Sequence, residues 1–370
     1  MRIDNIYAKI ISKENLYRSA HLAARGRRYK DAAADFSFHL EREVQALHRE
    51  LAGKTYRHGK YRTFTIFDPK ERNISAAPFR DRVIHHAVHD VIEPVIDKIF
   101  IYDSYACRKE KGTHKAVDRA QSFLRANRFC FHGDIRKYFP SIDRGILKEM
   151  LAKRIGDKDL LWLLEEIVDS AVSVSPCAPV PEGEGAGSAS KSGSPQAGAT
   201  ASPQKGLPIG NLTSQFFANL YLNELDYFVK FDLRLRYYLR YMDDFLIFEN
   251  DKEALSVVKQ KIRDFLKNRL ELRLHEGKSQ VYRTKTGIKF LGFRICKDYR
   301  RLASENVRRF KKRTQAQIAA HKRGELALEK IQTSVRCWTA HAKRANTYAL
   351  RKTLFRSELF SESGLGSQLF

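Results

Sequence analysis

The sequence predicts an α/β protein of the α+β kind, in which short antiparallel strands accompany amphipathic helices. Between residues 233 and 241 apolar residues alternate with polar ones, and an apolar run follows at 245–248. This pattern is typical of two strands joined by a tight turn. Elsewhere apolar residues recur every three or four positions, which is typical of helices with one buried face. A chain of 370 residues can form two or three packed subdomains.

Three helices follow from their apolar spacing and their end signals. The first stops at Gly53, and its buried face consists of Leu40, Val44, Leu47 and Leu51. The second covers residues 81–99, and Pro94 should kink or divide it because proline donates no backbone hydrogen bond. The third begins near Asn211 or Thr213, whose side chains suit a helix cap. Its buried face consists of Phe217, Leu220, Tyr221, Leu225 and Phe228.

Residues 175–205 differ in composition from the rest of the chain. They contain five Gly, five Pro, six Ser and six Ala among 31 positions. Such a segment buries too little apolar surface to offset the entropy lost on ordering. We therefore expect a disordered insertion, tolerated at the surface, between two parts of one subdomain.

The charge balance predicts a polyanionic partner. Lys and Arg number 68 against 43 Asp and Glu, a net charge of +25, and the isoelectric point is about 9.8. No apolar stretch approaches the roughly 18 to 20 residues that span a membrane, and no signal-peptide pattern opens the chain. Nucleic acid is therefore favoured over a membrane surface.

Neither the cysteines nor the histidines indicate a metal site. The five cysteines are scattered and lack a Cys-x-x-Cys pair, so we expect neither disulfides nor zinc, in a reducing cytoplasm. His85, His86 and His89 lie within the apolar pattern of a helix. A packing or RNA-facing role is favoured for them, because no further ligands stand at a zinc-like spacing.

Three aspartates are the strongest candidates for catalysis. Asp243 and Asp244 lie in RYMDDFLIF (240–248), at the turn between the two predicted strands, and Asp134 follows a short β-prone run at 129–131. Carboxylates brought together from neighbouring strands suit two divalent cations, which could hold a triphosphate. The tetrapeptide YMDD alone is equally compatible with a solvated turn, since acidic pairs are common in turns.

The segments FHGDIRKYFPSID (131–143) and RYMDDFLIF resemble the two metal-binding motifs of reverse transcriptases. Further segments resemble the other motifs of that family, in the same order: FDPKERNISAAPFRDRVIHHAV (67–88), SYACRKEKGTHKAV (104–117), GLPIGNLTSQFFANLYLNELD (206–226), HEGKSQ (275–280) and IKFLGFRI (288–295). The resemblance implies a right-hand polymerase with an N-terminal helical extension (1–60), fingers (61–128), a palm (129–294) containing the insertion, and a short basic helical thumb (295–370). We expect no endonuclease domain after the thumb.

The resemblance also implies roles for individual residues. Asp134, Asp243 and Asp244 would hold two Mg²⁺ ions, or Mn²⁺ in their place, and Lys278 would act as a general acid at the leaving pyrophosphate. A solvated lysine in a turn is the alternative for Lys278. Phe139 would block a ribonucleotide 2′-hydroxyl, so that the product is DNA. The basic residues Lys70, Arg72 and Arg80 of the fingers would bind the triphosphate and template; they could also be a solvated surface.

One segment narrows the choice within the family. Most members have Gln-Gly-x-x-x-Ser-Pro where this chain has Ile209, Gly210 and, five positions on, Gln215. This variant resembles the reverse transcriptases of diversity-generating retroelements, in the branch of group II introns and retrons. Ile209 replaces a side chain that could hydrogen-bond the nucleotide with one that cannot, which should loosen discrimination. The alternative is that Ile209 only packs beneath the nucleotide.

The resemblance to these retroelements implies error-prone copying, mainly opposite template adenines. The substrates would be dNTPs and a template-repeat RNA, the product cDNA, and the partner a small basic oligomeric accessory protein. We expect a bacterial or phage-encoded protein that acts in the cytoplasm. Two alternatives remain: a retron or group II intron-type reverse transcriptase of ordinary fidelity, and a catalytically silent RNA-binding protein with the same fold.

Overall fold

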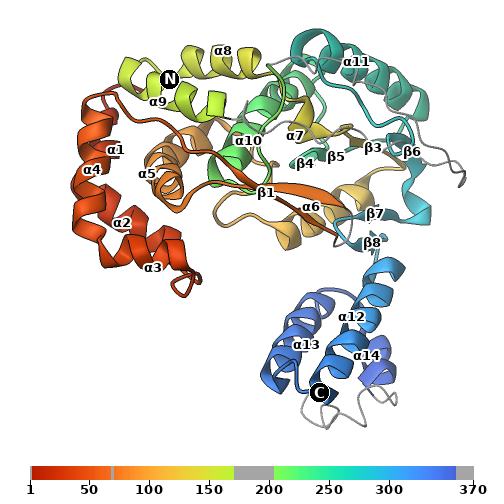
Figure 1. The fold of residues 1–370 in the computed structure, drawn as a ribbon. Coiled ribbons are helices and arrows are strands. Elements are labelled where there is room, and N and C mark those ends of the chain that lie inside the picture. Colours follow the sequence, from red (N-terminus) through yellow and green to blue (C-terminus); the bar gives the residue numbers. More distant parts are fainter. Residues whose placement is uncertain (1, 68–70, 171–203, 356–370) are drawn as a thin grey trace, which may run out of the picture. The chain divides into compact units, whose positions relative to one another are not determined.

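The computed structural model describes residues 2–67, 71–170 and 204–355. Lys70 lies outside the described residues, as does the 175–205 segment up to residue 203. The chain forms two compact units. Figure 1 labels their helices and strands along the chain. The first unit contains Met1–Tyr102, Ile135–Phe228 and Ile262–Leu274, and the second contains Asp103–Asp134, Val229–Lys261 and His275–Phe370. No helix among the described residues is long and apolar enough to cross a membrane.

The first unit begins with four helices. They are α1 (Tyr7–Ile11), α2 (Lys13–Ala24), α3 (Asp31–Phe38) and α4 (Leu40–Ala52). The predicted apolar face of α4 is confirmed, since Val44, Leu47 and Leu51 are buried and the helix ends at Gly53. Burying such a face supplies most of the stability of a helix of this length.

A hairpin and a long helix follow in the first unit. Strands β1 (Arg62–Ile66) and β2 (Arg72–Ala76) pair antiparallel. Helix α5 (Phe79–Ile96) packs against α2 and against α10 (Leu212–Tyr227). Pro94 was predicted to kink or divide this helix, and the structure shows no division there, because α5 continues two residues beyond Pro94. A single 3₁₀ turn, η1 (Asp97–Ile99), then completes the predicted span. His85 of α5 is fully buried, and its Nε2 atom lies 3.2 Å from the Nε2 atom of His58. Its role is therefore packing.

Four further helices that the structure describes belong to the first unit. They are α7 (Tyr138–Ser141), α8 (Arg144–Arg154), α9 (Lys158–Asp169) and α10 (Leu212–Tyr227). Asn211 is the N-cap of α10, as predicted, but its side chain does not cap the helix. Its amide group instead bonds to the Ser75 carbonyl (3.2 Å) and accepts from the Ala77 N–H (3.4 Å). The start of α10 is thereby tied to the end of β2.

The second unit is built on a four-stranded antiparallel sheet. Its strands, in spatial order, are β4 (Tyr238–Tyr241), β5 (Asp244–Glu249), β3 (Phe129–Asp134) and β6 (Gln280–Arg283). Helix α6 (Thr113–Ala126) contacts β4 and β5. The prediction that the strand starts near residue 233 is wrong. A π-helical turn, η3 (Phe228–Asp232), prolongs α10, and Arg234 has a positive φ of 53° that prevents an extended chain.

The rest of the second unit combines a small sheet with helices. The IKFLGFRI segment forms the hairpin β7 (Ile288–Phe290) and β8 (Phe293–Ile295), which is preceded by η4 (Thr284–Thr286) and extended by β9 (Arg300–Leu302). Helices α12 (Ser304–Lys322), α13 (Leu328–Ala342) and α14 (Tyr348–Phe355) follow. Phe310 of α12 stacks on Trp338 of α13, with ring centroids 3.9 Å apart. The basic residues of RRFKKR (308–313) are all exposed around the buried Phe310.

One long helix, α11 (Lys252–Leu270), crosses from the second unit into the first. The division into fingers, palm and thumb remains a prediction.

Candidate active site

The two adjacent aspartates lie where the sequence predicts, at the turn between two paired strands. Tyr241 at the end of β4 pairs with Asp244 at the start of β5, and only Met242 and Asp243 connect them. Met242 has φ of 57°, the left-handed conformation that tight two-residue hairpins require. Arg240 is fully buried and its Nη1 donates to the Met242 carbonyl at 3.0 Å. A buried guanidinium therefore fixes the shape of this turn.

The third aspartate lies opposite the pair. In the antiparallel register of β3 and β5, Asp134 is the direct partner of Asp244, and Gly133 is the partner of Phe245. A Cβ atom on Gly133 would lie 2.2 Å from the Phe245 ring, closer than real contacts allow. Glycine is thus required here because the ring of Phe245 occupies the space of a side chain. Our sequence reasoning missed Gly133, although it directly precedes Asp134.

The HEGKSQ segment is tied to Asp134 through both backbone and side chains. The Lys278 ammonium donates to both carboxylate oxygens of Asp134, each at 2.9 Å. The Asp134 carbonyl accepts from the His275 N–H at 2.8 Å, and the buried Ser279 hydroxyl accepts from the Asp134 N–H at 3.2 Å. Lys278 therefore pairs with an aspartate of the site, although its side chain is 46% exposed.

The surroundings of Asp243 favour its neutral form. Burial, with additional repulsion from Asp134 and Asp244, raises the pKa of Asp243 to about 6. Its own backbone N–H and the Lys278 ammonium act in the opposite direction, but more weakly than burial. The three carboxylates consequently repel one another, which is the electrostatic condition that a bound cation relieves.

His132 is a further residue of this site that our sequence reasoning did not identify. It lies two positions before Asp134 on β3, hence on the same face, and its Nε2 bonds to the Asp244 carboxylate. The period of two along the strand could have indicated this position. With Lys278 on Asp134 and His132 on Asp244, two of the three carboxylates have a protein partner.

The three carboxylates are suitable ligands for a metal ion, but in this structure they do not converge on one point. Carboxylate oxygens are the ligands that Mg²⁺ prefers. Among the described residues, however, no three His, Cys, Asp or Glu side chains already converge as a metal site. Asp134 and Asp244 would have to leave Lys278 and His132 to form one. The predicted set of donor residues is present, and its binding of metal ions remains a prediction.

The residues predicted to bind the nucleotide belong to the first unit. The Ile209 carbonyl accepts from the Ser75 N–H at 2.9 Å, which joins the GLPIG segment to β2. Gly210 has φ of 116°, and a Cβ atom there would lie 2.8 Å from the Ile74 side chain. The Phe139 carbonyl accepts from the Leu207 N–H at 3.0 Å. The structure thus gathers β2, the GLPIG segment and Phe139.

The other predicted nucleotide ligands are placed differently. Gln215 lies in the first turn of α10, partly buried, and Arg72 begins β2 with its side chain exposed. Arg80 is not a free phosphate ligand, because its guanidinium pairs with Glu50 and lies over the Tyr56 ring, 5.9 Å from the centroid.

The chain is similar to several known proteins. It is 24% identical to Protein YkfC of Escherichia coli over 72% of this chain and 74% of that protein. It is 23% identical to the Group II intron-encoded protein LtrA of Lactococcus lactis, covering 77% of this chain but only about half, 54%, of LtrA. A solved telomerase structure from Candida tropicalis, truncated from the C-terminal domain, aligns with a TM-score of 0.47 at 13% identity, covering 66% of this chain and 55% of that one.

Residues 67–295, more than half of the chain, match the family Reverse transcriptase (RNA-dependent DNA polymerase). That span contains all three aspartates and every other predicted site residue. The mixed α/β architecture with antiparallel sheets agrees with the right-hand polymerase fold of this family. The chain therefore belongs to the reverse transcriptases, the RNA-directed DNA polymerases.

Proposed function

We propose that this chain is the RNA-directed DNA polymerase of a diversity-generating retroelement, which copies a template-repeat RNA into adenine-mutagenised cDNA. The observation that carries the polymerase assignment is the strand register that sets Asp134 opposite Asp244, with Asp243 in the adjoining turn. The observation that favours the subtype is the sequence Ile-Gly-Asn-Leu-Thr-Ser-Gln at 209–215.

Asp134, Asp243 and Asp244 would hold two Mg²⁺ ions, with Mn²⁺ as a possible substitute. Such ions, when bound, lower the pKa of a primer 3′-hydroxyl and neutralise charge on the phosphates. The chain's own part is to orient the carboxylates through the hairpin turn and through His132. Lys278, released from Asp134, would carry the proton that the leaving pyrophosphate requires. Phe139 would exclude the ribonucleotide 2′-hydroxyl.

Ile209 is the residue to which we assign the loss of fidelity. A side chain without donor or acceptor cannot select among bases by hydrogen bonding. Its backbone is anchored to Ser75 of β2, so replacing the side chain should leave the segment in place. Ile209→Gln is therefore the informative substitution, and Gly210, Gln215 and Arg72 are the neighbouring positions we include in the nucleotide site.

Primer extension on a defined RNA with sequencing of the cDNA tests both parts of the proposal. The wild type should extend the primer with dNTPs and Mg²⁺, and Asp243→Ala should abolish extension while RNA binding persists. Errors should concentrate opposite template adenines, and Ile209→Gln should reduce them. Extension that survives Asp243→Ala would refute the assigned mechanism. A wild type that binds RNA but does not extend the primer would instead be an RNA-binding protein with this fold.

A group II intron or retron-type enzyme of ordinary fidelity is the second candidate. Its support is the similarity to LtrA, a group II intron-encoded protein. Errors spread evenly over the four template bases, and unchanged by Ile209→Gln, would favour this candidate.

The partners we propose follow from charge. The exposed cations of α12 at 308–313 suit the phosphates of template RNA and cDNA. The retroelement assignment adds a small basic oligomeric accessory protein and a bacterial cytoplasm. Co-purification from cells that express both genes would test that association.

A further inference from the structure

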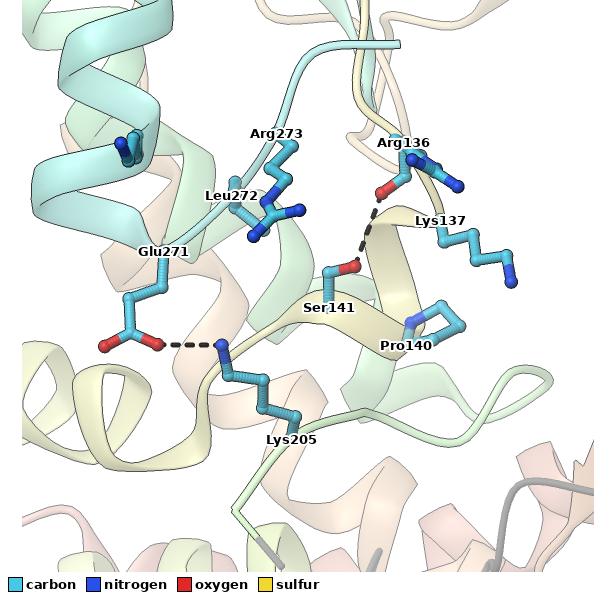
Figure 2. A pocket seen from close by; sticks show the side chains of 9 residues that line it. Arg136, Lys137, Pro140, Ser141, Lys205, Glu271, Leu272 and Arg273 are labelled. Atoms are coloured by element: carbon cyan, nitrogen blue, oxygen red, sulfur yellow. Dashed lines mark hydrogen bonds and ion pairs between the residues drawn. The ribbon is translucent and has the colours of Figure 1, made fainter. Parts of the chain in front are cut away.

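The first unit contains a strongly basic pocket that includes none of the predicted metal or nucleotide ligands. Its volume is about 510 Å³. The walls come from the segment after β3, from Lys205, and from the end of α11 with the residues that follow it (Figure 2). Five cationic side chains line it: Arg136, Lys137, Lys205, Lys267 and Arg273.

The residues that the structure describes compensate these charges poorly. Glu271 is the one acidic residue of the lining, and its carboxylate pairs with the Lys205 ammonium at 2.8 Å (Figure 2). The other four cations have no ion pair with any residue that the structure describes. A concave surface with one sign of charge concentrates the field and attracts counter-ions.

The backbone holds the cations in place despite their mutual repulsion. The Arg136 N–H donates to the Arg273 carbonyl at 2.9 Å, and Ile135 forms a bridge with Leu274. The two cation-bearing segments are thus joined side by side. Lys137 has a left-handed backbone, with φ of 47°, a conformation that costs energy for a residue with a side chain.

We propose that this pocket binds phosphate groups, supplied either by a nucleic-acid backbone or by a nucleoside triphosphate. Guanidinium groups make paired hydrogen bonds with phosphate oxygens, and ammonium groups add point charges, so the mixture of Arg and Lys suits this ligand. The volume lies within the range of small-ligand sites and accommodates more than one phosphate. The Glu271 carboxylate repels an anionic ligand, and it pairs with the Lys205 ammonium until a bound anion replaces it.

The test removes two pocket charges and compares a matched control. The variant Lys267→Gln/Arg273→Gln neutralises two side chains for which the structure gives no protein partner, whereas Lys252→Gln/Lys261→Gln neutralises two exposed lysines of α11 outside the pocket. Binding of a short labelled single-stranded RNA and of inorganic triphosphate is measured in separate titrations of the full chain. Circular dichroism verifies that both variants fold. No polymerisation is needed, so this test is independent of the proposed function.

The expected result is a smaller salt dependence for the pocket variant. Each phosphate contact contributes about 0.7 to the slope of log affinity against log salt for a single strand, so two contacts contribute about 1.4. Between 50 and 200 mM salt the wild type should then lose about sevenfold more affinity for RNA than the variant does. The control variant should lose less than the pocket variant in both slope and affinity.

The two titrations distinguish the phosphate sources. Weaker RNA binding with unchanged triphosphate binding assigns the pocket to the backbone, and the reverse result assigns it to the nucleotide. The opposite perturbation is Glu271→Gln, which removes the negative charge that pairs with Lys205 and should tighten binding of the same ligand several-fold. If the pocket variant and the control behave alike in both titrations, or if Glu271→Gln weakens binding, the proposal is overturned.

Discussion

The raised pKa of Asp243 predicts that ionisation of this carboxyl lowers the free energy of unfolding of the metal-free protein at neutral pH. The pKa of this carboxyl is 3.8 in an unstructured chain and about 6 in the folded protein. Below pH 3.8 the group is neutral in both states and contributes no penalty. Between pH 3.8 and 6 it ionises in the unfolded chain but stays neutral in the folded protein, so the folded state loses stability until its own carboxyl ionises above pH 6. The difference of about two pKa units corresponds to at most about 3 kcal/mol.

The assay compares the wild type with Asp243→Asn in EDTA, using the free energy of unfolding measured between pH 4 and pH 8. The asparagine is neutral throughout, so the wild type should be less stable than the variant at pH 8 by up to about 3 kcal/mol and nearly equal to it at pH 4. Mg²⁺ should restore more stability to the wild type than to the variant at pH 8, since it binds the ionised carboxylates. A stability difference that does not change with pH would refute the reasoning.

Three further substitutions test the frame of the site. Gly133→Ala should destabilise the protein by about 1–3 kcal/mol, because the new methyl group meets the Phe245 ring at 2.2 Å; thermal unfolding measures this, and an unchanged melting temperature would contradict the packing argument. Lys278→Ala removes the ammonium that occupies both oxygens of Asp134, so Mn²⁺ titrated without nucleic acid should bind several-fold more tightly even though primer extension slows; weaker Mn²⁺ binding would count against competition. Arg240→Met removes a buried charged hydrogen-bond donor from the YMDD turn and should cost about 1.5–3 kcal/mol, measured by urea unfolding, and a neutral effect would show that the turn holds its shape without it.

The hairpin that carries Asp243 and Asp244, and the strand end at Asp134, could be predicted because they depend on local patterns. Alternating apolar residues and a tight turn are visible in the sequence itself. The same alternation misplaced the start of β4, since Arg234 with its positive φ lies within the apparent strand. Arg240 was expected on the polar face, yet it is fully buried. Periodicity cannot show that both faces of a short strand are covered.

The partners of individual side chains were beyond the reach of sequence reasoning because they come from distant parts of the chain. Arg80 reads as a free cation, but Glu50 of another helix neutralises it. Asn211 reads as a helix cap, but β2 supplies better-placed partners for its amide. The basic pocket likewise joins residues from three separate segments, none of which is unusual alone.

The antiparallel register of β3 and β5 makes the chain unequally tolerant of changes in length. Asp134 and Asp244 are about a hundred residues apart along the chain but occupy one row of the sheet. Because side chains alternate between faces, one inserted codon within either strand would turn one aspartate to the opposite side. Outside the two-residue turn of Met242 and Asp243, the connecting segments carry no such requirement. Gain and loss of codons during evolution should therefore be confined to the connections, while the six-residue frames of β3 and β5 keep their length even where their sequences drift.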